Sequence, residues 1–400
     1  MDHLDVKTAD LKRRGGLYTA KEISGQPDLW EKTYLKLCQE KEQVLKFLKK
    51  VTEKENCDII LTGAGTSAFI GEVLAGPLQR EWNVSCRAIG TTDLLTHPQN
   101  YFFKSRPTLL ISFARSGDSP ESVAVVELAC RYCDELYALN ITCNEQGELA
   151  RMSGNENFQL FLLPEETNDR SLAMTSSFSS MLLAGLLIIN IRKLEQLGPV
   201  VKKVKDLGHY ILNEHLPKLK KIAGMGFDRM VFLGSGPLLG VAHESHLKVQ
   251  ELSDGKIVCT YDSFLGFRHG PKAVVNEATV VAYLLSNNVY SRNYELDLVR
   301  SVKETGAGEK SIVIGNGYDE KEFQFDVMIQ FPETINEIPE EFLSVFYVLP
   351  AQIIGFYKSL DLGLSPDSPS RRGAISRVVQ GVKIYREEVP GQLNGYEAGY

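Results

Sequence analysis

The sequence contains the same pattern of an apolar run, a glycine turn and a helix twice. Residues 58–67 read DIILTGAGTS, and residues 228–238 read DRMVFLGSGPL. Apolar residues recur at helical spacing after each turn. Such a segment opens a βα unit, and short apolar strands separated by helices predict a parallel sheet covered by helices on both faces. The repetition predicts an α/β protein with two doubly wound parallel sheets in tandem.

The other periodic segments complete these two units. In the first unit we expect strands at 85–89, 108–113, 136–141 and 158–163 and helices at 120–133 and 176–193. In the second we expect a helix at 240–252 and strands at 257–261, 280–285, 311–314 and 327–331. Amphipathic spacing predicts a helix at 26–54, and the last helix is expected at 339–358. The predicted organisation is an N-terminal helical segment (1–50), domain 1 (51–199), a helical connector (200–222), domain 2 (223–364) and a tail (365–400).

Charge and apolar patterning exclude several classes of protein. The chain has 51 acidic and 44 basic residues among 400, and this net charge of −7 argues against sequence-independent nucleic-acid binding. The N-terminus has no apolar signal segment, and the longest apolar run, Met181–Ile191, is far shorter than the roughly 20 residues that span a bilayer. Seven scattered cysteines form no disulfide framework, and Cys130 and Cys133 have CxxC spacing within a helical pattern, where a redox or metal role is the minor alternative. We therefore expect a cytoplasmic protein without membrane or nucleic-acid partners.

Three hydroxyl-rich turns in the first unit indicate a phosphate site. They are residues 63–67 (GAGTS), 116–119 (SGDS) and 175–177 (TSS). Backbone N–H groups and hydroxyls at helix N-termini bind anions, and ligands of doubly wound sheets bind at the carboxyl ends of the strands. The first two turns also have purely structural explanations: the first fits a tight βα turn, and Ser119 before Pro120 fits a helix N-cap. Their recurrence favours a phosphorylated small molecule. The candidate binding residues are Gly65, Thr66, Ser67, Arg115, Ser116, Ser119, Thr175 and Ser176.

The second unit carries different chemistry. Lys248 and Glu251 stand three residues apart on one face of the helix after Gly236, either as a functional pair or as a surface ion pair. His243 and His246 on the same helix admit a weak metal alternative. His269, in the sequence FRHGP, suits acid–base chemistry near neutral pH and equally fits a structural loop histidine.

Together, GAGTS, SGDS, HLKVQELS and FRHGP resemble the sugar-isomerase (SIS) domain family, which is arranged in tandem in the isomerase half of glucosamine-6-phosphate synthase. The resemblance covers about residues 57–382. The segments GLYTAKEISGQPDLW and SPSRRGAISRVVQG are closer still to the AgaS group, named tagatose-6-phosphate ketose/aldose isomerase. That resemblance implies deamination of galactosamine 6-phosphate with isomerisation, by an enzyme without a metal or organic cofactor.

The resemblance also implies roles for individual residues. Ser67, Ser116 and Ser119 correspond to hydroxyls that hold the sugar phosphate. Glu251 corresponds to the carboxylate that moves a proton between C2 and C1, Lys248 to the lysine that polarises the reacting oxygens, and His269 to the histidine that opens the sugar ring from the neighbouring subunit. The protein is therefore expected to be a homodimer or higher homo-oligomer with shared active sites.

The sequence departs from the synthase pattern at several positions. Ala114 replaces a serine, Met174 lies near another ligand serine, and two additional residues separate Glu251 from His269. The tail lysine of the synthase has Arg377 or Ser376 as its nearest counterpart. Two alternatives follow: an aldose–ketose isomerase that acts on a hexose 6-phosphate such as tagatose 6-phosphate without releasing ammonia, and a non-catalytic sugar-phosphate-binding regulator.

Overall fold

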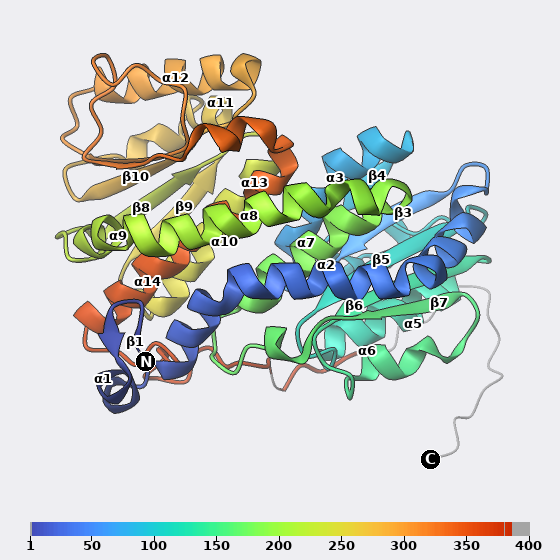
Figure 1. Cartoon of the computed structure of the whole chain (residues 1–400). Coiled ribbons are helices and arrows are strands. Elements are labelled where there is room, and N and C mark those ends of the chain that lie inside the picture. Colours follow the sequence, from blue (N-terminus) through green and yellow to red (C-terminus); the bar gives the residue numbers. More distant parts are fainter. Residues whose placement is uncertain (1, 380, 386–400) are drawn as a thin grey trace.

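The computed structural model, which describes residues 2–379 and 381–385, contains two five-stranded parallel sheets with helices packed between and around them (Figure 1). The first sheet has the order β4-β3-β5-β6-β7, and the second has the order β9-β8-β10-β11-β12. In each sheet the first strand of the unit lies second from one edge. The second strand lies on one side of it, and the third, fourth and fifth strands follow on the other side, so the two sheets share one doubly wound topology. The predicted fold class is confirmed.

The first sheet is built by an alternation of strands and helices. Its strands are β3 (Asp58–Thr62), β4 (Cys86–Ala88), β5 (Thr108–Ala114), β6 (Leu136–Thr142) and β7 (Phe158–Leu162). The helices are α3 (Thr66–Trp82), α4 (Thr91–Thr96), α5 (Pro120–Tyr132), α6 (Glu148–Arg151) and α7 (Ser176–Ile189). β3, β5 and β6 are buried along their whole length, which explains why they are apolar runs rather than alternating sequences.

The second sheet repeats this arrangement. Its strands are β8 (Arg229–Leu233), β9 (Val258–Asp262), β10 (Thr279–Leu284), β11 (Lys310–Ile314) and β12 (Val327–Ile329). The helices are α10 (Pro237–Leu252), α11 (Phe264–Phe267), α12 (Val289–Lys303), α13 (Glu340–Tyr347) and α14 (Leu349–Asp361). Between the sheets the chain passes through α8 (Gly198–Tyr210), a π-helical turn (Ile211–His215) and α9 (Leu216–Ala223).

The two glycine turns have nearly the same backbone conformation. Gly65 has φ 54° and ψ −128°, and Gly236 has φ 53° and ψ −126°. A residue with a side chain rarely adopts this conformation, so glycine is required at both positions. The duplication predicted from sequence thus extends to the backbone of the turns.

The helices between the sheets form a single core. α10 packs against α3, and Gly240 permits the close approach, because a Cβ atom there would lie 2.6 Å from Val73 Cγ2 and 2.9 Å from Val73 N. The apolar helix α7 is entirely buried and lies against α2 (Leu17–Thr52) and α3. Within the described residues, Glu340–Asp361 is long and apolar enough to cross a membrane, and it is wholly buried in this core.

Several element boundaries differ from the predictions. α2 begins at Leu17 rather than at residue 26, α7 ends at Ile189, and the predicted last helix is divided into α13 and α14. A small hairpin, β1 (Asp2–His3) and β2 (Val6–Lys7), and the short helix α1 (Thr8–Arg14) precede α2. The predicted domain boundaries remain predictions, and residues 380 and 386–400 of the predicted tail lie outside the described residues.

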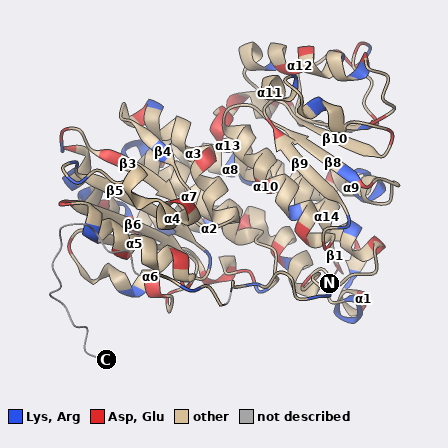
Figure 2. Cartoon of the chain, turned by 180° about the vertical axis from the view of Figure 1, so that it is seen from behind, with Lys and Arg blue, Asp and Glu red and all other residues tan. Residues whose placement is uncertain are grey.

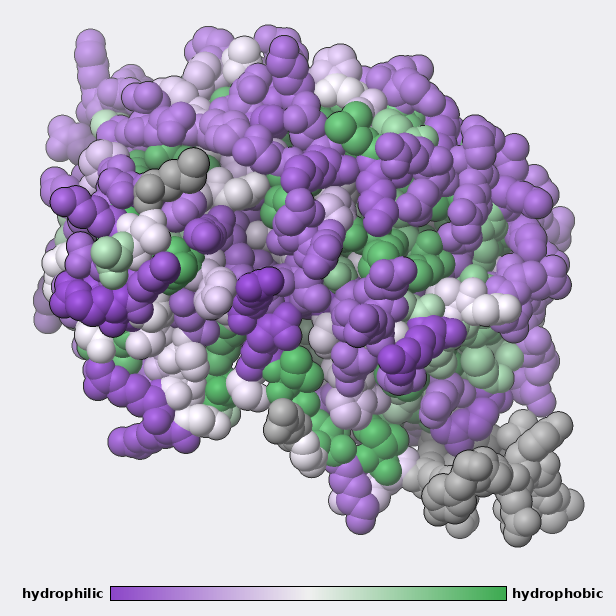
Figure 3. Space-filling view, turned by 60° about the horizontal axis from the view of Figure 1, so that its bottom comes forward, coloured by the Kyte–Doolittle hydropathy of each residue, from purple (hydrophilic) through white to green (hydrophobic). Residues whose placement is uncertain are grey.

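The described part of the tail runs along the molecule below α2 in the view of Figure 1. The carboxylate of Asp367 accepts hydrogen bonds from the backbone and the hydroxyl of Thr19, both at 2.8 Å. Hydrophilic side chains cover most of this lower face, with apolar side chains between them (Figure 3). Acidic and basic residues are interspersed over both halves of the molecule (Figure 2).

Candidate active site

Lys248 connects the two halves of the molecule at the N-terminus of α3. Its ammonium group donates to Glu251 Oε2 at 2.6 Å and to Thr66 Oγ1 at 3.0 Å, and it lies 3.4 Å from Glu244 Oε1. The Lys248 side chain is 1% exposed, and that of Glu251 is 21% exposed. The alternative of a surface ion pair is therefore wrong: the lysine is buried, and only the Glu251 carboxylate reaches solvent.

The helical repeat places these three residues on one face of α10. Positions 244, 248 and 251 follow the i, i+4, i+7 spacing, and the close packing at Gly240 brings this face against the first turn of α3. The first glycine turn, which starts α3, thus meets the charged residues of the second unit.

Burial changes the proton affinity of the charged groups on α10. Burial raises the pKa of Glu244 to about 8, with the Glu251 carboxylate acting in the same direction and Lys248 against it. Neither Glu244 oxygen accepts a hydrogen bond from a described residue. Burial opposes the charged form of Lys248, but Glu244 and Glu251 outweigh it, and the pKa of Lys248 is raised. The site therefore holds a cationic lysine between one solvent-accessible carboxylate and one buried carboxyl that is largely protonated at neutral pH.

The first two hydroxyl turns lie at the same edge of the first sheet. β3 and β5 are paired in parallel, with Thr62 opposite Ser112, so the turns after them are neighbours. Thr66 and Ser67 are 5% and 4% exposed, and Gly65 is exposed. Ser67 Oγ lies 4.0 Å from Met174 Sδ, the residue that stands near a ligand serine of the synthase.

The second turn is held by its own hydrogen bonds. Ser119 caps α5 by accepting from Ser122 N and donates to Ser122 Oγ at 2.6 Å, which confirms the N-cap. Ser116 Oγ accepts from Asp118 N at 3.3 Å, and its carbonyl accepts from Asn144 at 2.8 Å. Ser116 and Ser119 are half-buried, and contact of their hydroxyls with a ligand stays a prediction.

The third turn has structural partners inside the protein. Thr175 and Ser176 are fully buried, and the Asp169 carboxylate accepts from both backbone N–H groups and from the Thr175 hydroxyl. The Ser176 hydroxyl donates to the backbone carbonyl of Glu22. A ligand role for Thr175 and Ser176 stays a prediction, and in this conformation their hydroxyls are occupied.

The two predicted arginines also bind protein groups. The guanidinium of Arg115 is buried and donates to the backbone carbonyls of Ser171, Leu172 and Arg377. That of Arg377 donates to the Asp169 carbonyl and the Asn168 side chain, both at 2.8 Å. These hydrogen bonds connect the tail to the segment before α7. Contacts of Arg115 and Arg377 with a substrate remain a prediction.

His269 lies apart from this cluster. It follows α11 at an exposed position, and no described residue of the chain forms a hydrogen bond or ion pair with its side chain. A role for His269 in the active site of a neighbouring subunit stays a prediction.

The metal and redox alternatives find no support in the described residues. His243 stacks between Phe69 and Tyr261 and contacts Glu72 at 2.9 Å, and no cluster of three metal-binding side chains occurs within 2–379 and 381–385. Burial raises the pKa of both Cys130 and Cys133, which makes their thiols less reactive.

Sequence reasoning assigned no role to two buried acids beside the site. Glu244 could have been found from its spacing of four residues before Lys248. Asp169 lies in an irregular segment without a local pattern, and its partners are visible only in the structure.

Comparisons with known proteins give the family of the chain. The SIS domain family matches residues 53–191. D-galactosamine-6-phosphate deaminase AgaS of Shewanella sp. (strain ANA-3) is 39% identical over 96% of this chain and 95% of its own, and that of Escherichia coli is 39% identical over 92% and 96%.

Solved structures give the same result. Tagatose-6-phosphate ketose/aldose isomerase from Escherichia coli superposes with a TM-score of 0.85 at 36% identity, covering 94% of this chain and 98% of that one. A Clostridium novyi protein described as a candidate enzyme of the same name has a TM-score of 0.93 at 42% identity, covering 97% and 100%. Because it is 36–42% identical to these relatives over at least 92% of its length, this chain belongs to the AgaS family of SIS-domain proteins.

Proposed function

We propose that the protein is an enzyme that converts galactosamine 6-phosphate and water into tagatose 6-phosphate and ammonia. The relatives named galactosamine-6-phosphate deaminase, identical at 39% over nearly the full length, support this substrate. The proposed location is the cytoplasm.

The observation that carries the proposal is the contact between Lys248 and Thr66. It places the Glu251 carboxylate of the second unit beside the hydroxyl turn of the first. A sugar whose phosphate binds at Ser67, Ser116 and Ser119 would then extend its other end toward Glu251.

The chemistry begins with opening of the sugar ring. His269 of a neighbouring subunit would move the ring-opening proton, and the active unit is accordingly a homodimer or larger homo-oligomer. The exposed position of His269, outside the Glu251 cluster, supports this arrangement.

Proton transfer from C2 to C1 follows in the open chain. Glu251 removes the C2 proton, forming an enolamine, and returns the proton to C1, which leaves an imine at C2. Lys248, held cationic by the Glu251 carboxylate at 2.6 Å, stabilises the negative charge that develops on the C1 oxygen. Water then adds to the imine carbon and ammonia leaves, giving the ketose.

A coupled ammonia assay tests this proposal. The purified protein should release ammonia from galactosamine 6-phosphate faster than from glucosamine 6-phosphate, the C4 epimer. Absence of ammonia release from either sugar, with tight binding retained, would instead identify a regulator.

The second candidate is an aldose–ketose isomerase without nitrogen loss, which the name of the Escherichia coli structural relative favours. The same Glu251 could move a proton between C2 and C1 of a hexose 6-phosphate. Interconversion of tagatose and galactose 6-phosphates at a higher kcat/KM than deamination would favour this alternative.

A further inference from the structure

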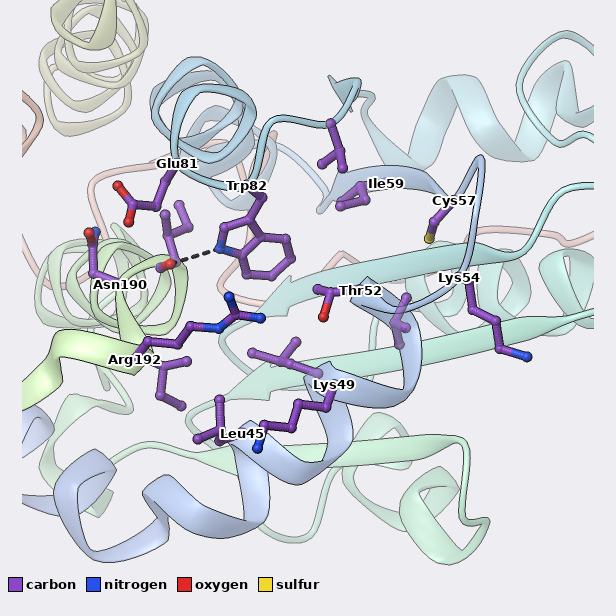
Figure 4. Close-up of a pocket in the computed structure, with 15 residues that line it drawn as sticks. Leu45, Lys49, Thr52, Lys54, Cys57, Ile59, Glu81, Trp82, Asn190 and Arg192 are labelled. Atoms are coloured by element: carbon purple, nitrogen blue, oxygen red, sulfur yellow. Dashed lines mark hydrogen bonds between the residues drawn. The ribbon is translucent and has the colours of Figure 1, made fainter.

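A cavity of about 240 Å³ opens at the end of the first sheet opposite to the candidate active site (Figure 4). It lies beside the start of β3, where α2, α3 and α7 end, whereas Thr66 and Ser116 follow the other ends of their strands. Its apolar wall includes Leu48, Ile59, Trp82 and Ile191. A sugar phosphate bound at the hydroxyl turns would not reach it.

The charges that line this cavity do not cancel. Glu81 is paired with Lys193 at 2.8 Å, and Lys54 with Glu135 at 2.7 Å. The other two charged side chains of the lining, Lys49 and Arg192, form no ion pair or side-chain hydrogen bond within the described residues. Two exposed positive charges of the lining therefore have no acidic side-chain partner among the described residues.

These two cations are not needed to cap the helices that end here. The Lys49 carbonyl accepts from Glu53 N, and the Leu186 carbonyl accepts from the Asn190 side chain. The Ile189 carbonyl accepts from Trp82 Nε1 at 2.8 Å. These carbonyls thus have donors other than Lys49 and Arg192.

Trp82 supplies a flat surface beside the cations. Its only polar atom is satisfied by Ile189, and its ring is half-buried in the lining. Figure 4 shows the Arg192 side chain extending into the space between Trp82 and Lys49. An aromatic or aliphatic body could pack on the indole while an anionic group meets the ammonium and guanidinium groups.

We propose that this cavity is a second ligand site, for a small organic anion with an apolar body. The apolar part packs against Trp82, Ile59 and Ile191, and the anionic group lies between Lys49 and Arg192. Because the cavity is at the opposite end of the sheet, its ligand binds together with the sugar phosphate and does not compete with it.

Two dyes that differ only by a sulfonate group test the proposal. Anilinonaphthalene sulfonate is an apolar anion, and N-phenyl-1-naphthylamine is its uncharged parent. The chain contains two tryptophans. Trp30 is fully buried and donates a hydrogen bond to Ser179, and Trp82 lines the cavity. We expect saturable binding of the sulfonate with energy transfer from Trp82, and W82F should remove most of that transfer.

The charge requirement is tested by a double variant, Lys49→Gln with Arg192→Gln. The sulfonate should bind roughly tenfold more weakly to it, the loss expected when charge-assisted contacts are removed, while the uncharged dye binds as before. Lys50→Gln is the matched control, because Lys50 lies on the same turn but contacts Glu156 and does not line the cavity. Added salt should weaken binding of the sulfonate to the unmodified protein and leave the uncharged dye unaffected, a measurement that does not depend on the variant folding.

Any one of four results would overturn the proposal. The first is equal affinity of the sulfonate for the unmodified protein and the folded double variant, and the second is equal salt response of the two dyes. The third is displacement of the dye by galactosamine 6-phosphate. The fourth is dye emission that is unchanged by W82F.

Discussion

Lys248 donates a hydrogen bond to Thr66 Oγ1 at 3.0 Å, although the two residues are 182 positions apart in the chain. Thr66 begins the helix after the first glycine turn, and Lys248 lies in the helix after the second. At this contact the two copies of the unit thus contribute different groups, a hydroxyl from the first and a charged side chain from the second.

Thr66→Val removes the hydroxyl with little change in shape and leaves the buried ammonium with one acceptor fewer. We expect kcat/KM to fall roughly 10- to 100-fold, equivalent to about 1.4–2.7 kcal/mol. Thr66→Ser, which keeps the hydroxyl, should retain most activity. Steady-state kinetics that show no difference between the two variants would contradict a role for this contact.

Glu251→Gln keeps the size of the side chain but cannot accept a proton. We expect kcat to fall by about 100- to 10,000-fold, while the affinity for galactosamine 6-phosphate measured by calorimetry changes little. Glu145→Gln, at an exposed position, is the control for loss of a carboxylate. A Glu251→Gln variant with an undiminished kcat would remove Glu251 from the mechanism.

Glu244 should make stability depend on pH. Its pKa rises from 4.5 to about 8 on folding, so the folded state keeps a proton that the unfolded state releases. The stabilisation is complete below about pH 4.5 and is lost as the pH rises to about 8. Glu244→Gln cannot titrate, so the Tm of the unmodified protein should fall relative to the variant by several degrees over this range. Parallel Tm profiles would show that Glu244 is not held protonated.

Asp169→Asn should loosen the segment before α7. The buried carboxylate accepts from the N–H groups of Thr175, Ser176 and Ser177, at 2.8, 3.0 and 2.9 Å. We expect the free energy of unfolding to fall by about 2–4 kcal/mol, with faster amide exchange at 171–177.

Asp118→Asn is the control for Asp169→Asn, because exposed Asp118 also accepts a backbone hydrogen bond, from Glu148 N. Chemical denaturation should show a much smaller loss for Asp118→Asn. Equal losses would mean that Asp169 has no special structural role.

The fold was predictable because its determinants are local. Buried parallel strands are apolar runs, and Gly65 and Gly236 adopt a backbone conformation that other residues avoid, so both signals are present in short windows of sequence. Helix boundaries were less predictable: α2 begins at Leu17, before the clear amphipathic spacing.

The candidate site was predictable only in part. The spacing of Lys248 and Glu251 puts them on one face of α10, but their environment depends on the packing of α10 against α3. Patterning alone therefore left a surface ion pair open. Arg115 and Arg377 donate hydrogen bonds to backbone carbonyls where the tail contacts the segment before α7. Such a contact between distant segments leaves no periodic pattern in the sequence.

The central claim is that the first unit holds the phosphate while Glu251 acts on C2 of the same sugar. The most direct measurement is a crystal structure with the open-chain analogue 2-amino-2-deoxygalactitol 6-phosphate, which has no aldehyde and cannot react. The account predicts phosphate oxygens within hydrogen-bond distance of Ser67, Ser116 and Ser119, and C2 within about 3.5 Å of the Glu251 carboxylate. A phosphate bound away from these hydroxyls, or a Glu251 carboxylate that does not reach C2, would contradict it.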